Sequence, residues 1–138
     1  MRNMSFALTT QQVLAETKTV TRRLGWLNLR AGDQIRAVRK CMGLRPGERV
    51  EPLAVLRVVN VRREPLRRMA DDVDYGFAEV AAEGFADHPT CKWPSAFVDF
   101  FCATHRGCTP ETEVTRIEFA YVGANVEANR PTKARDDI

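Results

Sequence analysis

Residues 9–23 bring together three kinds of side chain that can do chemistry. Lys18 supplies an amine, Thr21 supplies a hydroxyl, and Arg22 and Arg23 supply guanidinium groups. A lysine amine acts as a base or nucleophile when its pKa is lowered, which burial and neighbouring cations both do. Guanidinium groups bind anions through several donors at once. The alternative is a solvated basic helix end, where cations suit the negative end of the helix dipole.

The local pattern predicts a short helix that ends just before these residues. Thr9 and Gln12 have the spacing of a capping box, and an apolar pair follows them. β-branched residues predominate after residue 16, so the chain is expected to leave the helix there. Lys18, Thr21 and Arg23 should therefore lie where a helix passes into a loop or strand, a place from which a rigid element aims side chains.

The composition indicates one domain in a reducing compartment. With 138 residues, 44% of them hydrophobic, the chain has the size of one domain and can bury a core. No run approaches the roughly 18 apolar residues of a membrane span, and residues 1–12 lack the apolar region of a signal peptide. The 4 cysteines match no disulfide framework, so we expect a reduced, cytoplasmic protein.

The net charge of +3 hides an asymmetry between the two halves of the chain. Residues 1–68 hold 15 Lys and Arg against 5 Asp and Glu, whereas residues 69–138 hold 6 against 13. A basic half indicates an anionic partner, most often nucleic acid. The alternative is that the two halves neutralise each other across one fold.

Apolar patterns predict a small sheet. The strongest signal is residues 53–63, where both faces are apolar for part of the length, so this strand should be central or lie in a closed sheet. Pro65 should end it. Further strands are expected at residues 5–8, 34–40 and 113–122.

Helices are expected on the flank of this sheet. Residues 77–82 form one, with Gly84 as a fitting C′ residue, and Pro94 begins another. This order predicts an α+β fold with a small, barrel-like β-sheet and flanking helices. Residues 1–122 then form the domain, and the tail, residues 123–138, lacks periodicity and is expected to be disordered.

Two features of these helices bear on a site. Glu83 falls at a helix C-terminus, where a carboxylate is unfavourable by about 0.3–1 kcal/mol, so it is either simply solvated or kept there for a purpose. Phe97, Phe100 and Phe101 form an apolar stripe on the last helix, which Gly107 should close. We interpret this stripe as core and not as a platform for stacking bases.

Neither a metal nor a cofactor is expected. Cys102, His105 and Cys108 have the spacing C-x2-H-x2-C, which Cys91 and His88 would complete, but structural zinc sites usually use C-x2-C pairs. We therefore interpret the thiols as buried or incidental. The chain has neither a glycine-rich phosphate motif nor the G-x-S-x-G motif of serine hydrolases.

Residues 15–23 resemble the signature of the ASCH domain, which runs roughly G-x-K-x-x-E-x-R. The turn at Gly32-Asp33 resembles the next block of that family, and Glu83-Gly84-Phe85 resembles its E-G-F element. The resemblance spans about residues 5–122. The whole chain resembles the small ASCH-domain proteins of bacteria and phages. It implies a PUA-like β-barrel.

This chain departs from the signature in two places. Glu16 stands where the family has glycine, and Thr21 stands where it has glutamate. The second departure resembles a branch that hydrolyses N4-acylated cytidine with a lysine, a threonine and a downstream glutamate. This resemblance implies that Lys18, Thr21 and Glu83 are catalytic, although Glu79 also aligns with the glutamate.

Three functions stay open at this point. The first is the binding of RNA or a modified nucleotide in a basic cleft formed by Lys18, Arg22 and Arg23, since PUA-like and ASCH relatives are associated with RNA. The second is an amidohydrolase that acts on an acylated cytidine nucleoside. The third is a protein-interaction module that assembles through its charge asymmetry. An open groove at Lys18 favours RNA, whereas a closed pocket that joins Lys18 to Glu83 favours a small ligand.

Overall fold

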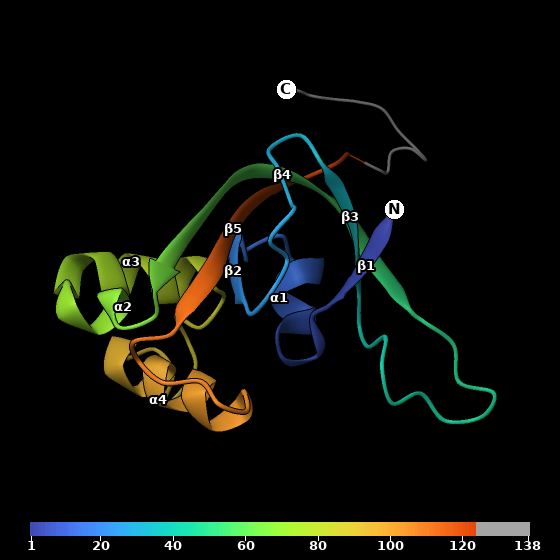
Figure 1. The fold of residues 1–138 in the computed structure, drawn as a ribbon. Helices are drawn as coiled ribbons and strands as arrows, with labels where there is room; N and C mark the ends of the chain where they lie inside the picture. Colours follow the sequence, from blue (N-terminus) through green and yellow to red (C-terminus); the bar gives the residue numbers. More distant parts are fainter. Residues whose placement is uncertain (124–138) are drawn as a thin grey trace.

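The computed structural model describes residues 1–123, which form one five-stranded sheet with the helices of residues 68–104 packed at one end (Figure 1). The strands are β1 (Arg2–Ser5), β2 (Val20–Arg23), β3 (Gln34–Val38), β4 (Pro52–Pro65) and β5 (Glu113–Tyr121). Their order in the sheet is β1-β3-β4-β5-β2. The β1–β3 pair is parallel, and the other three pairs are antiparallel.

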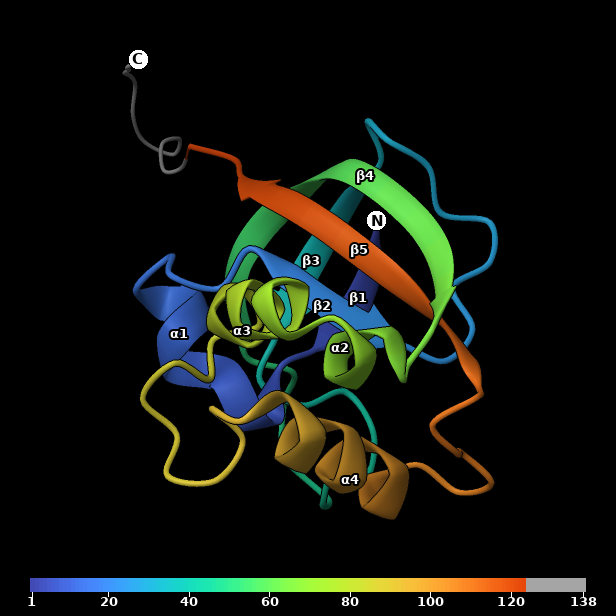
Figure 2. The ribbon, with the colours of Figure 1, turned by 90° about the vertical axis from the view of Figure 1, so that its left-hand side faces the viewer.

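The sheet curls into a half-barrel, in which β4 and β5 arch over the other strands (Figure 2). The β4–β5 register shifts between Val58 and Asn60, and such irregularities bend a strand pair and increase its twist. β1 and β2 form the two edges of the sheet. Arg23 bridges these edges, because its Nη2 donates to the carbonyl oxygen of Ser5 at 2.6 Å. The α+β class expected from the sequence is confirmed.

The central strand expected at residues 53–63 is confirmed as β4, which lies between β3 and β5 and ends at Pro65. Its two faces differ in burial. Leu56 and Val58 are fully buried, whereas Val59 on the opposite face is 46% exposed. One apolar face therefore carries most of the burial, because the sheet is covered mainly on its concave side.

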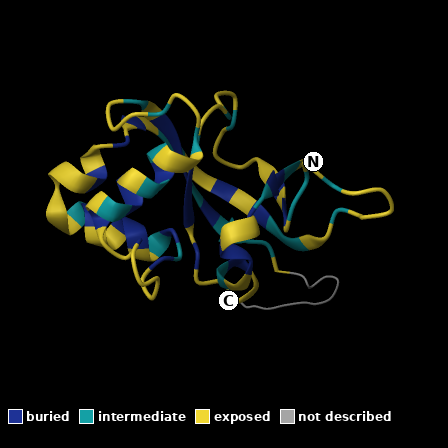
Figure 3. Ribbon diagram, turned by 90° about the horizontal axis from the view of Figure 1, so that it is seen from below, coloured by how far each residue is buried: buried dark blue, intermediate teal, exposed yellow. Residues whose placement is uncertain are grey.

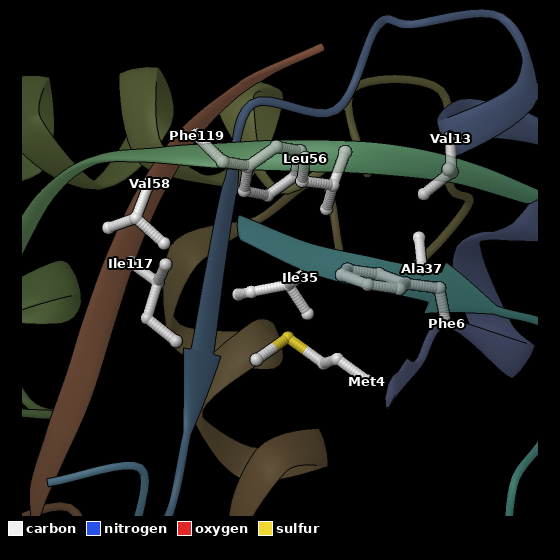
Figure 4. Close-up of a cluster of buried hydrophobic side chains, with 9 residues drawn as sticks. All are labelled: Met4, Phe6, Val13, Ile35, Ala37, Leu56, Val58, Ile117 and Phe119. Atoms are coloured by element: carbon white, nitrogen blue, oxygen red, sulfur yellow. The ribbon is translucent and has the colours of Figure 1, made fainter. Parts of the chain in front are cut away.

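The inside of the half-barrel holds the main hydrophobic core (Figure 4). Ile35 and Ala37 on β3 lie beside Leu56 on β4, and a T-shaped pair of rings, Phe6 and Phe119, closes the cluster. Fully burying side chains of this size contributes about 1.5–3 kcal/mol each. The remaining members of this core are Met4, Val13, Val58 and Ile117.

The N-terminal segment differs from the expectation at two points. The strand lies at Arg2–Ser5, earlier than the predicted 5–8, because a 3-10 turn (Ala7–Thr9) follows it and leads directly into α1 (Thr10–Leu14). The predicted capping box is wrong: Thr9 is the N-cap of α1, but its side chain caps no backbone N–H. Thr10 instead donates its hydroxyl proton to the carbonyl oxygen of Phe6 at 2.9 Å.

A second hydrophobic core joins the remaining helices to the sheet. These helices are α2 (Arg68–Asp71), α3 (Val73–Ala82) and α4 (Pro94–Thr104). Pro94 occupies the first turn of α4, as expected, and Gly107 follows the helix end with a positive φ of 76°. The side chains of this core are Leu66, Met69, Val80, Phe85, Cys91, Phe97, Val98, Phe101 and Val114.

Buried and exposed positions alternate along the strands and helices, as amphipathic elements require (Figure 3). Within residues 1–123, no helix has the length and apolar character needed to cross a membrane. The structure covers the domain expected at residues 1–122. The tail expected at residues 123–138 lies, from residue 124 onward, outside the described residues.

Candidate active site

A pocket of about 250 Å³ lies between the chain after β1, strand β2 and helix α4. Its polar side is formed by Lys18, Thr21, Arg22, Arg23 and Glu83. Aromatic side chains form much of the remaining wall. The full lining adds Ser5, Phe6, Ala7, Leu8, Thr9, Phe85, Phe97, Phe100, Phe101, Thr104 and His105. The structure therefore gathers all three residues of the expected lysine–threonine–glutamate set at one cavity.

Strand β2 positions the polar side of the pocket, as the sequence predicted for a segment that leaves a helix. Thr21 and Arg23 lie two residues apart, so their side chains share one face of the strand. Arg22 lies between them and reaches Glu79 of α3 instead. The segment before β2 is tied to the end of α3, because the N–H of Thr19 donates to the carbonyl of Ala82 at 2.8 Å.

Lys18 is almost completely buried, with 2% of its surface exposed. Its Nζ donates to the Glu83 backbone carbonyl at 2.6 Å and to Glu83 Oε1 at 3.0 Å. The rings of Phe6 and Phe85 lie near the amine, and their centroids are 6.0 and 5.8 Å from Nζ. Burial lowers the pKa of Lys18 and outweighs the opposing attraction of Glu83, while the nearby Arg23 and Arg22 lower the pKa further.

Glu83 is the C-cap residue of α3, as expected from the sequence. Two cations hold its carboxylate: Lys18 at Oε1 and Arg22 Nη1 at Oε2, the latter at 3.1 Å. These contacts offset the unfavourable dipole at a helix C-terminus. Gly84, with φ of +95°, follows it, and a Cβ there would meet the side chain of Gln12 at 3.1 Å. Glycine thus lets the end of α3 approach α1.

The structure distinguishes Glu83 from Glu79, either of which matched the glutamate of the family in sequence. Glu79 does not line the pocket but receives Arg22 Nη2 at 2.6 Å and Arg116 Nε at 2.6 Å. Arg22 also donates to Glu64 Oε2 at 3.0 Å, so one guanidinium serves three carboxylates. Burial opposes ionisation of Arg22, but the carboxylates prevail and raise its pKa.

Glu64 and Arg116 belong to this buried network, although no sequence motif predicted them there. Arg116 lies directly across from Arg22 in the β2–β5 register, and both reach Glu79. The one available signal was an arginine within the apolar alternation of β5. Three ion pairs around the site join the basic half of the chain to the acidic half: Lys18–Glu83, Arg22–Glu79 and Arg22–Glu83. These pairs agree with mutual neutralisation of the two halves.

Arg23 has different surroundings from Arg22. Its Nε donates to Thr21 Oγ1 at 3.1 Å and its Nη2 donates to the Ser5 carbonyl at 2.6 Å. Both acceptors are neutral, and within residues 1–123 no carboxylate forms an ion pair with Arg23. Burial lowers the pKa of Arg23 to about 10, so that the side chain is still a cation at neutral pH. The guanidinium also lies 4.8 Å from the centre of the Phe6 ring.

The phenylalanine stripe is core and also forms part of the pocket wall. Phe97 and Phe101 are buried, as expected, whereas Phe100 is only half-buried. Phe85 packs on Phe97 with T-shaped rings at 5.5 Å, and His105 stacks on Phe101 at 3.9 Å. The lining of the pocket therefore combines cationic and hydroxyl groups with aromatic rings.

Of the residues weighed as zinc ligands, only two lie close together in the described part of the chain. Cys102 and Cys108 lie 4.0 Å apart at their sulfur atoms, while His105 is turned onto Phe101. His88 accepts the backbone N–H of Cys91 at 2.9 Å. Residues 1–123 contain no group of three His, Cys, Asp or Glu side chains arranged to hold a metal ion.

Two solved structures have folds similar to that of this chain. One is the ASCH domain from Lactobacillus crispatus, with a TM-score of 0.57 and 15% identity over 87% of this chain and 78% of that one. The other is a protein from Enterococcus faecalis of the DUF984 family, with a TM-score of 0.51 and 19% identity over 88% of this chain and 78% of that one. No protein-family model and no curated protein matches the sequence. The chain therefore has the fold of an ASCH domain.

Proposed function

We propose that this protein is an amidohydrolase that removes the acyl group from an N4-acylcytidine-type nucleoside. The observation that carries the proposal is the position of Lys18, buried beside Glu83 in a pocket that Thr21 also lines. A buried amine with a lowered pKa, next to a carboxylate, is the arrangement expected of a catalytic base. The resemblance of the Lys18-x-x-Thr21 pattern to the hydrolytic branch supports the choice of substrate.

The pocket supports a small ligand over a polymer. Its volume of about 250 Å³ lies just below the roughly 300–1,000 Å³ of typical ligand pockets. A pyrimidine with its acyl group fits a cavity on this scale better than a folded or single-stranded RNA does. The aromatic wall formed by Phe85, Phe97 and Phe101 gives a planar base a surface to contact.

The reaction follows from the positions of the side chains. Two N–H groups of Lys18 donate to Glu83, which leaves one tetrahedral position of the amine for the pocket. In the neutral state this position is a lone pair that takes a proton from water as the water oxygen bonds to the acyl carbon. The proton passes to Glu83, 3.0 Å away, and then to the exocyclic nitrogen as the carbon–nitrogen bond breaks. The products are a carboxylic acid, which releases its proton to water at neutral pH, and the free cytidine amine.

A second candidate is the binding of RNA or a modified nucleotide without hydrolysis. The observation in its favour is Arg23, a pocket cation held only by neutral oxygens. The side chain of Arg22 does not favour it, because this guanidinium is 0% exposed and serves three carboxylates. The basic cleft proposed from Lys18, Arg22 and Arg23 thus reduces to Arg23 as the group best able to meet a phosphate.

The test is an assay of the purified protein on N4-acetylcytidine and on short RNA. We expect release of acetate and cytidine, detected by chromatography, and weaker interaction with RNA. Failure of the wild-type protein to hydrolyse a series of N4-acylcytidines would end the enzymatic proposal for this substrate class. Tight binding of RNA together with no hydrolysis would favour the second candidate.

A further inference from the structure

Arg23 is the one pocket-lining cation for which residues 1–123 supply no ion-pair partner. Lys18 pairs with Glu83, and Arg22 pairs with Glu64, Glu79 and Glu83. Arg23 meets only Thr21 Oγ1 and the Ser5 carbonyl. Burying a cation without a counter-charge costs desolvation free energy, and an anion that enters the pocket offsets that free energy. The position of Arg23 thus makes negative charge on a ligand favourable at this side of the pocket.

Thr21 supplies a second donor at the same place. Its Oγ1 accepts the N–H of Arg23 Nε at 3.1 Å, which leaves the hydroxyl proton of Thr21 for another acceptor. Within the described part of the chain, that hydroxyl donates to no other group. Thr21 and Arg23 both line the pocket that Lys18 and Glu83 enter. Two preorganised donors therefore lie on the face of β2 that adjoins the amine.

We propose that Arg23 is a further catalytic residue, which together with the Thr21 hydroxyl binds the oxygen anion of the tetrahedral intermediate. This inference rests on the proposed amide hydrolysis. When water adds to the acyl carbon, the carbon–oxygen π electrons move onto the acyl oxygen, which becomes the anion. When the carbon–nitrogen bond breaks, those electrons return to the carbonyl. Donors aimed at this oxygen act on the intermediate more strongly than on the neutral amide.

Arg22 shows why the assignment falls on Arg23. The two arginines are adjacent, yet Arg22 points toward α3, where three carboxylates already satisfy its charge. A guanidinium whose charge is already neutralised by carboxylates stabilises a developing anion only weakly. The alternation of side chains along β2 puts Thr21 and Arg23 on one face of the strand and Arg22 on the other. Arg22 also lines the pocket, but its guanidinium is held by the buried carboxylates.

The experiment measures kcat and KM for wild type, Arg23→Lys, Arg23→Gln and Arg57→Gln on an N4-acylcytidine. Arg57 is an exposed arginine on β4 and serves as the matched control. Removing one oxyanion donor costs about 10²–10³ in kcat, so Arg23→Gln should lose that much with little change in KM, and Arg57→Gln should retain the wild-type rate. Arg23→Lys should retain more activity than Arg23→Gln. An Arg23→Gln enzyme with wild-type kcat would overturn the assignment.

A merely structural role is tested separately, because Arg23 also bridges β1 and β2 through Ser5. Circular dichroism and melting curves establish that each variant is folded. Added guanidinium ion should then restore part of the kcat of a folded Arg23→Gly variant, because the free cation can occupy the vacated space. Loss of kcat that added guanidinium does not restore, in a variant of wild-type stability, would contradict a direct role in the reaction.

The failure of this inference differs from the failure of the proposed function. If the wild type hydrolyses no N4-acylcytidine, the function fails, and the anion site is tested by titrating acetate while the Arg23 Nε signal is followed by nuclear magnetic resonance. A saturable shift that is absent in Arg23→Gln supports the anion site. No shift in the wild type overturns it.

Discussion

Lys18 and Glu83 are separated by 65 positions in the chain, yet their Nζ and Oε1 atoms lie 3.0 Å apart in a buried ion pair. The pair joins the entry to β2 with the end of α3. Nζ also reaches the backbone carbonyl of Glu83, so the amine is held at two points. This tertiary contact holds the amine of Lys18 in the pocket, and the predictions for Lys18 and Glu83 depend on it.

Lys18→Arg should abolish hydrolysis while the protein remains folded. Guanidinium stays protonated and cannot take a proton from water, although it keeps the positive charge beside Glu83. The measurement is product release from an N4-acylcytidine, with Lys92→Arg, an exposed lysine, as the control that should keep full activity. Persistent turnover by a folded Lys18→Arg protein would remove Lys18 from the base role.

The pH profile of kcat/KM should rise with pH and level off below the ordinary lysine pKa of about 10.4. Burial, Arg23 and Arg22 lower the pKa of Lys18, so its reactive neutral form accumulates at lower pH than that of an exposed lysine. In the same window the unfolded chain binds more protons than the folded one, so stability should also rise with pH. A profile flat over this range would indicate another base.

Glu83→Gln and Glu79→Gln should have different consequences. Glu83 lines the pocket beside Lys18, so its amide variant should lose turnover. Glu79 serves Arg22 and Arg116 behind the pocket, and breaking a buried ion pair costs about 3–5 kcal/mol, so its variant should lose mainly stability. Urea melts and initial rates on both variants give the comparison. Equal loss of turnover at equal stability would contradict this division.

Phe101→Ala should destabilise the fold by about 3–5 kcal/mol, because Phe101 is buried between Phe97 and His105. Phe100→Ala, at a half-buried position of the same helix, should cost much less. Chemical denaturation of the two variants provides the measurement. A near-neutral Phe101→Ala would mean that α4 presents this side chain outward, and a partner surface would then be the better explanation of the stripe.

Any binding of RNA should weaken as salt rises, because the cations that meet phosphates release condensed counterions. Arg23→Ala should reduce such affinity directly. Arg22→Ala should reduce the affinity for RNA only indirectly, by destabilising the fold, since the Arg22 side chain is fully buried and paired. Filter binding at several salt concentrations, with melting curves for each variant, separates the two effects. Binding that salt leaves unchanged would argue against contact with the phosphate backbone.

Local patterns in the sequence predicted several parts of this molecule correctly. The apolar run at residues 53–63 predicted a central strand, and Pro94 marked the start of α4. The β-branched residues before Thr21 indicated an exit from α1 into a loop or strand, which is β2, and Gly84 placed Glu83 at a helix end. Each signal depends on neighbouring residues, which constrain φ, ψ and side-chain periodicity directly. The capping box failed because the 3-10 turn before α1 gave Thr9 a different role.

Tertiary structure alone decided which charged residues face the pocket. Glu79 and Glu83 lie four positions apart, a spacing that keeps them near one helix face, so periodicity could not separate them. The sequence likewise grouped Arg22 and Arg23 in one basic cleft, whereas the fold pairs Arg22 with three carboxylates and leaves Arg23 with neutral acceptors. The packing of α3 against β2 and β5 settled both questions, since Glu79 reaches Arg116 and Glu83 reaches Lys18. Long-range ion pairs of this kind depend on where separate elements meet in space, and no local pattern encodes that position.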